Sequence, residues 1–238
     1  QGNKEAQFNL GESYEKGRGV QQDDKEAGEW YQKAADQGVA NAQCQLGRML
    51  SQGRGVIKDE GKALKWYQKA ADQGHLEAQT NRGAMYEYGN GLKKDGKKAF
   101  QLYRKAAERG HAKAQTLLGV LLLNGKEVEK DNKEGAKWIN KAAEQGYPMP
   151  QSVLGLIYEN GLGVTEDFVI AYAWYEIAAV NGSADGRAGK GRIVKGMTPD
   201  QIAEGQKLSR EMVKKNPKLL KTPAANKAKR GLSPAEEK

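Results

Sequence analysis

The chain has 238 residues, of which 38% are hydrophobic and 29% charged, and its mean hydropathy of -0.83 is low for a compact globular protein. The formal net charge is +9, and residues 214–238 carry +6 of it, because eight of the 39 basic and two of the 30 acidic residues lie there. The rest of the chain is therefore close to neutral. No apolar run approaches the ~20 residues that a bilayer span requires, and a single cysteine excludes an internal disulfide framework.

The chain opens on residues that close a repeat elsewhere, because Gln1-Gly2 matches Gln37-Gly38 and Gln73-Gly74. Residues 1–5 are therefore expected to be the end of a truncated upstream repeat. From there a 36-residue period is carried by Gly11, Gly47, Gly83, Gly119 and Gly155, by Gly17, Gly53, Gly89, Gly125 and Gly161, and by alanine pairs beginning at Ala34, Ala70, Ala106, Ala142 and Ala178. A fixed period of this length indicates a stacked repeat protein, in which each unit contacts only its neighbours.

The first half of each repeat reads as a helix. In the first repeat, Ala6, Leu10 and Tyr14 fall at helical spacing and predict its buried side. Gly11 lies inside this helix at a cost of about 1 kcal/mol relative to alanine. Because the cost recurs in every repeat, we expect another helix backbone to pass close to it. Gly17 suits the left-handed residue that ends such a helix.

The second half of each repeat reads as another helix. An aspartate recurs at its start and can cap its free backbone amides: Asp23, Asp59, Asp95, Asp131 and Asp167. In the first repeat, Ala27, Tyr31 and Ala34 mark the packed side of this helix together with Trp30. Each pair of helices leaves an apolar side that only the next pair can cover, so the sequence predicts an all-α array of antiparallel helix pairs.

Three segments carry a resemblance to a known family. Residues 42–47 (AQCQLG), 53–56 (GRGV) and 66–74 (WYQKAADQG) resemble the Sel1-like repeat, a relative of the tetratricopeptide repeat. The resemblance implies a right-handed superhelical solenoid with a C-terminal capping helix, an adaptor role, and in bacteria often an exported protein that meets host or envelope partners, which favours the periplasm or secretion. The expected layout is five repeats over 6–186 (6–41, 42–77, 78–113, 114–149, 150–185), capping helices over 186–216 and a basic tail over 217–238.

The C-terminal end departs from the period. Residues 183–195 read as a last helix of the first type. Thr198, Pro199 and Gln201 then form a helix start, with the threonine as N-cap, and the helix 199–215 is expected to cover the last repeat. Beyond it the tail is expected to be solvated, with one short turn at 233–236. The alternative is that this basic tail binds an acidic partner, a nucleic acid or a membrane surface.

The residues that could carry chemistry occupy ordinary repeat positions. His75 and His111 are 36 residues apart in a variable slot, and Cys44 shares its slot with a phenylalanine, a serine and two threonines. Two histidines without a clustered cysteine or carboxylate make a poor metal site, and the glycine-rich loops lack a P-loop lysine–serine pair. The sequence therefore predicts no catalytic, cofactor-binding or metal-binding residue, no cofactor and no enzyme.

A partner is expected on the side of the first helices that lies opposite their buried stripe, the concave face of the array. This face is polar in the first two repeats, where it includes Glu15, and apolar in the last two. The candidate contact residues are Glu12, Arg48, Gln52, Ala84, Tyr88, Leu117, Val120, Leu123, Val153 and Leu156. The alternative is that the apolar residues among them pack against adjacent first helices and bind nothing.

Three functions follow from this sequence. The leading one is a non-enzymatic scaffold or adaptor that binds a peptide or protein on the concave face. A structural or regulatory subunit of an envelope or secretion assembly is the second. Nucleic-acid binding through the basic tail is the third; it is disfavoured because the body is near neutral and its aromatic residues recur at core positions.

Overall fold

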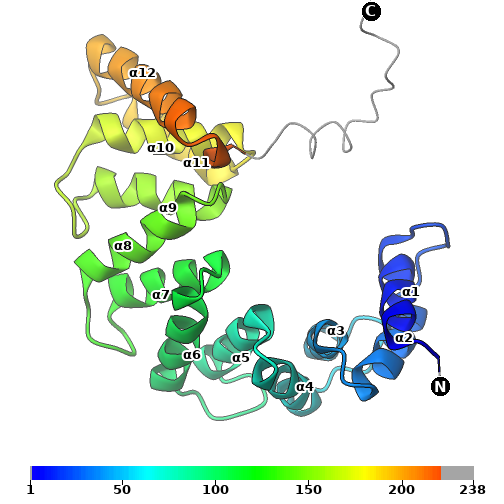
Figure 1. Ribbon diagram of the computed structural model, residues 1–238. Coiled ribbons are helices and arrows are strands. Elements are labelled where there is room, and N and C mark those ends of the chain that lie inside the picture. Colours follow the sequence, from blue (N-terminus) through cyan, green and yellow to red (C-terminus); the bar gives the residue numbers. More distant parts are fainter. Residues whose placement is uncertain (1, 221–238) are drawn as a thin grey trace, which may run out of the picture. The chain divides into compact units, whose positions relative to one another are not determined.

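The computed structural model describes residues 2–220, and all regular structure within them is helical (Figure 1). This confirms the predicted all-α array of helix pairs. The chain divides into two compact units, the first ending at Ala114 and the second beginning at Gln115. Within residues 2–220, no helix combines the length and the apolar character needed to cross a membrane.

The first unit consists of three helix pairs. Its helices are α1 (Lys4–Lys16), α2 (Asp24–Asp36), α3 (Ala40–Gln52), α4 (Glu60–Asp72), α5 (Leu76–Tyr88) and α6 (Gly96–Glu108). Each helix contacts the next one along the chain, as stacked hairpins require. Small and aromatic residues of the second helices fill the core, and the side chains of Tyr31 and Tyr103 are fully buried.

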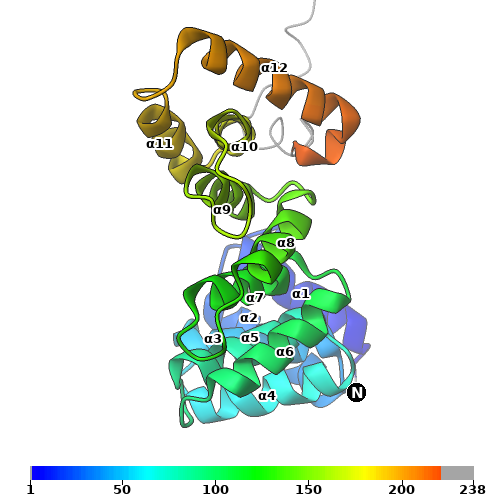
Figure 2. The ribbon, with the colours of Figure 1, turned by 90° about the vertical axis from the view of Figure 1, so that its left-hand side faces the viewer.

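The second unit continues the pattern and closes it. Its helices are α7 (Ala112–Asn124), which starts at the end of the first unit, α8 (Asn132–Ala143), α9 (Pro148–Glu159), α10 (Phe168–Val180), α11 (Ala184–Ile193) and α12 (Pro199–Lys215), followed by the short 3-10 helix η1 (Pro217–Leu219). Helix α10 contacts α9, α11 and α12 (Figure 2). It is apolar on nearly all sides because it is enclosed by these three helices.

The predicted helix boundaries are confirmed by the caps. Asp23 Oδ1 accepts hydrogen bonds from the backbone amides of Lys25 and Glu26, at 2.8 and 3.1 Å. The other four recurrent aspartates each accept one such bond at the start of α4, α6, α8 and α10. Gly17 ends α1 in the left-handed region at a φ of 63°, which is open to glycine without the Cβ clash that other residues meet.

The recurrent glycine inside each first helix has a different reason from the one predicted. A Cβ at Gly11 would lie 2.7 Å from the ring of Tyr31, and one at Gly47 would lie 2.9 Å from the ring of Tyr67. The close neighbour is therefore the aromatic side chain of the second helix and not a helix backbone. Gly119 is the exception, because there Ile139 replaces the tyrosine and a backbone oxygen also comes within 2.9 Å.

The C-terminal cap forms as predicted, and the packed chain extends past it. Helix α12 starts with the full capping box of Thr198 and Gln201 and covers α10, with Gly205 against the Tyr172 ring. Residues 217–220, which were predicted to belong to the tail, pack against the last repeat. Leu219 is 3% exposed, and its main-chain oxygen accepts hydrogen bonds from Gln151 and Asn181. The turn expected at 233–236 and the remaining tail lie outside the described residues.

Candidate binding groove

The ten candidate contact residues all lie on first helices, from α1 to α9. None of them is buried, and Gln52, Tyr88 and Leu156 are exposed. The first unit holds the polar members. Glu12 pairs with Lys16 on the same helix at 2.5 Å, an exposed contact of the kind that contributes little to stability.

Arg48 belongs to a buried ionic cluster centred on Glu15. The Arg48 guanidinium donates to Glu15 Oε1 at 2.5 Å, Arg54 donates to the same oxygen, and the Tyr31 hydroxyl donates to Oε2 at 2.6 Å. Glu15 is 8% exposed, so its expected place on the exposed polar side of the first helices was wrong. The spacing along α1 placed its backbone correctly, but the hydroxyl at the end of Tyr31 draws its carboxylate inward.

The electrostatics of this cluster follow from its geometry. Burial by itself would raise the pKa of the Glu15 carboxyl, but hydrogen bonds from Tyr31 and Arg54 and the charges of Arg48 and Arg54 outweigh it, so the pKa is lowered. Burial and the neighbouring Glu15 carboxylate raise the pKa of the Tyr31 hydroxyl. The cluster therefore holds a carboxylate and a neutral phenol at neutral pH, and it ties α1 to α2 and α3.

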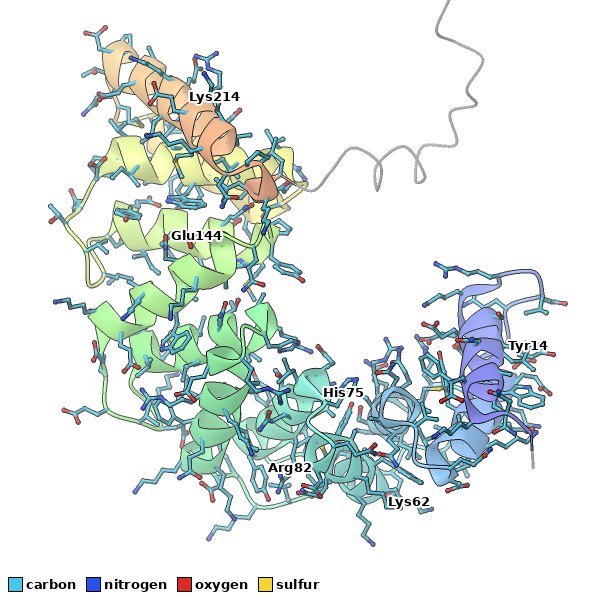
Figure 3. The ribbon with its side chains drawn as sticks, viewed as in Figure 1. Tyr14, Lys62, His75, Arg82, Glu144 and Lys214 are labelled. Carbon is cyan, nitrogen blue, oxygen red and sulfur yellow. The ribbon has the colours of Figure 1, made fainter. Side chains whose placement is uncertain are left out.

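Polar bridges also join the N-terminal ends of successive first helices in this unit. His75, the N-cap of α5, places Nε2 3.0 Å from Asn41 Oδ1 on α3 (Figure 3). Glu77 accepts from Lys113 Nζ at 2.7 Å and lies 3.1 Å from His111 Nε2. The hydrogen bond from His111 is the main cause that lowers the pKa of Glu77 to about 2. Both histidines thus have structural contacts.

The apolar candidates of the second unit lie in different surroundings, and Leu117 on α7 is partly buried. Val120, Leu123 and Val153 pack against the core that α8, α9 and α10 share, so the packing alternative holds in part for them. Leu156 does not follow this pattern and is 43% exposed. Met149, about two turns nearer the start of α9 on the same face, is 51% exposed. An apolar strip therefore remains open on α9.

This strip lines a groove of about 250 Å³ between α9 and α11. Its lining consists of Met149, Ser152, Val153, Leu156, Tyr175, Asp185, Ala188 and Arg192. Two of the ten predicted residues, Val153 and Leu156, are thus brought together here. The three residues from α11 were not predicted, because the sequence of this last helix departs from the period. Arg192 lies in the slot of Arg48, which could have signalled them.

The polar end of the groove is held in place by charge pairing. Arg192 donates to both carboxylate oxygens of Glu159, at 2.9 and 2.6 Å, and the Tyr175 hydroxyl donates to the same carboxylate at 2.5 Å. The hydrogen bond from Arg192 is the main cause that lowers the pKa of Glu159. This arrangement repeats the Glu15 cluster and fixes α11 against α9, so the groove is preformed.

The groove offers surface for binding. Among residues 2–220, no three His, Cys, Asp or Glu side chains are grouped to hold a metal ion. Cys44 is buried, and burial raises the pKa of its thiol to about 12. An open apolar floor with a fixed arginine at one end is suited to receive an apolar side chain of another polypeptide segment.

Comparison with known proteins gives one family and several similar structures. The family profile described as Sel1 repeat matches residues 4–39, 40–75, 76–111, 112–147 and 151–183. The chain is similar to a Sel1 repeat protein from Oxalobacter formigenes at 33% identity, with 88% of each chain covered and a TM-score of 0.75. A search of curated proteins gives no match.

Two further structures carry descriptive names. One is c5321, a protective antigen of uropathogenic Escherichia coli with an SLR fold, at 31% identity and a TM-score of 0.54. This similarity covers 99% of the present chain and 58% of the antigen. The other is the immunity protein Pa5087 from Pseudomonas aeruginosa, at 25% identity and a TM-score of 0.56, with 91% of this chain and 81% of that one covered.

Proposed function

Because the chain belongs to the Sel1 repeat family, whose members are generally non-catalytic scaffolds for protein interaction, we propose that it is a non-enzymatic adaptor. It binds a peptide or protein along its first helices, and the groove between α9 and α11 is the principal contact. The similarity to the Sel1 repeat protein from Oxalobacter formigenes, at 33% identity, supports the family membership on which this proposal rests.

The exposed apolar strip of α9 is the observation that carries the proposal. Met149 and Leu156 keep about half of their surface open, at 51% and 43%, although both lie on a helix whose other face is fully packed. Apolar residues gathered around a hollow, with polar groups at the edge, are typical of sites that receive another chain. In the first unit, polar bridges cover the corresponding N-terminal ends of the first helices. Helix α9 differs from them because its apolar side chains remain exposed.

The test is a comparison of two variants of the full chain as baits for interacting proteins. Leu156→Asp places a charge in the groove, whereas Ile57→Asp makes the same kind of change in the first unit, at a residue that is 92% exposed and far from the groove in sequence. Both residues are exposed, so neither change should disturb folding, which circular dichroism verifies. We expect specific partners to be retained by wild type and Ile57→Asp and lost with Leu156→Asp.

Each partner is then measured with purified protein. Loss of one apolar anchor from an interface typically costs about 1–2 kcal/mol, and the buried charge adds to it, so the affinity should fall by about tenfold or more. If the proteins captured by the wild type bind Leu156→Asp and Ile57→Asp equally well, the groove is not their binding site.

A further inference from the structure

The groove between α9 and α11 carries one unbalanced charge. Among the described residues that line it, Asp185 and Arg192 are the charged ones. Arg192 donates to both carboxylate oxygens of Glu159, so those two charges cancel. Asp185 lies exposed in the first turn of α11, and within residues 2–220 no basic side chain pairs with it. One net negative charge therefore remains at the end of the groove where α11 begins.

The first unit shows how the chain itself balances an acid at this position of the repeat. Met149 and Asp185 are 36 residues apart, so they occupy the same position of neighbouring first helices. In the first unit that position holds Glu77 and Lys113, and Lys113 Nζ donates to Glu77 Oε1 at 2.7 Å. Side chains at this position thus reach each other across neighbouring first helices. Because methionine cannot pair with a carboxylate, the place of the lysine beside Asp185 is open to a basic group of another molecule.

The polar groups in the floor of the groove already have partners. The Ser152 hydroxyl is bonded to that of Ser183 at 2.8 Å, and the Tyr175 hydroxyl donates to Glu159 at 2.5 Å. The remaining surface of the hollow is apolar and comes from Val153, Leu156 and Ala188. Its volume of about 250 Å³ lies below the range of about 300–1,000 Å³ that is typical of small-molecule sites. The hollow therefore suits one large apolar side chain of a polypeptide.

The unpaired carboxylate and the hollow are one helical turn apart. Asp185 and Ala188 are three residues apart on α11, which is about 4.5 Å along the helix axis. One polypeptide segment can reach both points if its two side chains are about two residues apart in an extended chain or about three to four residues apart in a helix. The aliphatic stem of a lysine or arginine that pairs with Asp185 can cover Met149, which is 51% exposed.

We propose that the groove recognises a partner segment that combines one basic residue with one large apolar residue. The basic residue pairs with Asp185, as Lys113 pairs with Glu77 in the first unit, and its stem covers Met149. The apolar residue fills the hollow and contacts Leu156. The inference rests on the proposed function, because it names the chemistry of the partner at the same site. Leu156 supplies affinity, whereas Asp185 selects basic partners over acidic ones.

Selection of a random peptide library against the full chain tests this. From the wild type we expect peptides in which a lysine or arginine lies close to a large apolar residue. Asp185→Lys reverses the charge and should enrich acidic residues in place of the basic ones. Asp200→Lys is the matched control, because Asp200 is also exposed in the first turn of a helix, α12, and lies outside the groove lining. It should select the same peptides as the wild type, and circular dichroism verifies that each variant is folded.

One selected peptide is then measured by titration calorimetry at low salt. Asp185→Asn should weaken its binding by about fivefold, the effect that one partly exposed charge pair can supply, whereas Asp200→Asn should leave it unchanged. Replacing the basic residue of the peptide by glutamine should cost the same factor on the wild type and nothing further on Asp185→Asn. High salt should remove most of the difference, because it screens an exposed charge pair.

The contrary results separate this inference from the proposed function. Selected peptides without a basic residue, or peptides that bind Asp185→Asn as tightly as the wild type, would overturn the role of Asp185. If the same peptides lose their binding to Leu156→Asp, the groove remains the binding site and only the chemistry of the partner is wrong. If the selection yields no peptide that depends on Leu156, the groove does not recognise short segments and the inference is wrong, whatever the bait variants show for larger partners.

Discussion

Alanine at Gly47 tests the most regular feature of the repeat. The Cβ of Gly47→Ala would lie 2.9 Å from two atoms of the Tyr67 ring, well inside the 3.5–4.0 Å of an ordinary carbon contact. Tyr67 is 3% exposed, so its ring has no free space to move into. Overpacking of this kind costs about 1–3 kcal/mol, whereas replacing a helical glycine by alanine contributes about 1 kcal/mol in the other direction. The clash should win, with a net loss of about 1 kcal/mol.

Gly61→Ala is the matched control, because it lies in the first turn of α4 and its Cβ would meet only the Asp59 side chain, at 3.5 Å. Here the helix preference acts alone, so stability should rise by up to about 1 kcal/mol. Thermal unfolding followed by circular dichroism should show Gly47→Ala about 2–4 °C below wild type and Gly61→Ala above it. A Gly47→Ala variant as stable as Gly61→Ala would refute the argument that the tyrosine ring requires glycine.

Three other predictions follow from the ionic contacts and the thiol. The contacts of Glu77 lower the pKa of its carboxyl from the usual 4.5 to about 2, so its stabilising effect is complete above pH 4.5 and is lost as the pH falls toward 2. The urea concentration at the midpoint of unfolding should therefore decrease between pH 4.5 and 2. In Glu77→Gln this decrease should be smaller. Glu15→Gln should lower the free energy of unfolding in urea by about 1–3 kcal/mol, because it breaks the ionic cluster around a buried carboxylate. Glu12→Gln removes only an exposed ion pair and should lower it by under about 1 kcal/mol. Equal losses in the two variants would contradict the contribution of the cluster. Cys44 should resist alkylation at pH 8 until urea unfolds the chain, since its pKa is raised to about 12; rapid modification of the native protein would contradict its burial.

Much of the fold could be predicted because each position of the repeat occurs several times in the sequence, so that its residue preference can be recognised. The aspartate caps, the left-handed Gly17 and the capping box at Thr198 each depend on local backbone chemistry, which a sequence displays directly. The role of Gly11 was predicted only in part. The repeated glycine indicated a close approach, but the identity of the neighbour depends on how far Tyr31 reaches across the hairpin, which spacing does not give.

The candidate site was harder to predict for the same reason. Helical spacing places a residue on a face, but it does not say whether a neighbour covers that face. Glu15 was expected on the exposed face and is buried, where it accepts hydrogen bonds from Tyr31 on α2, Arg48 on α3 and Arg54 in the loop that follows α3. Leu123 was placed with Leu156 and instead packs on the core, whereas Leu156 borders the groove because α11 leaves it open. Docking of the chain at Leu219 depends on contacts that span long sequence separations.

Binding of a purified partner to matched variants tests the central claim most directly. Titration calorimetry with the wild type, Leu156→Asp and Ile57→Asp compares the same substitution inside and outside the groove. The groove predicts that Leu156→Asp weakens binding by about tenfold or more while Ile57→Asp leaves it unchanged. Equal affinities of all three proteins would contradict a binding site between α9 and α11.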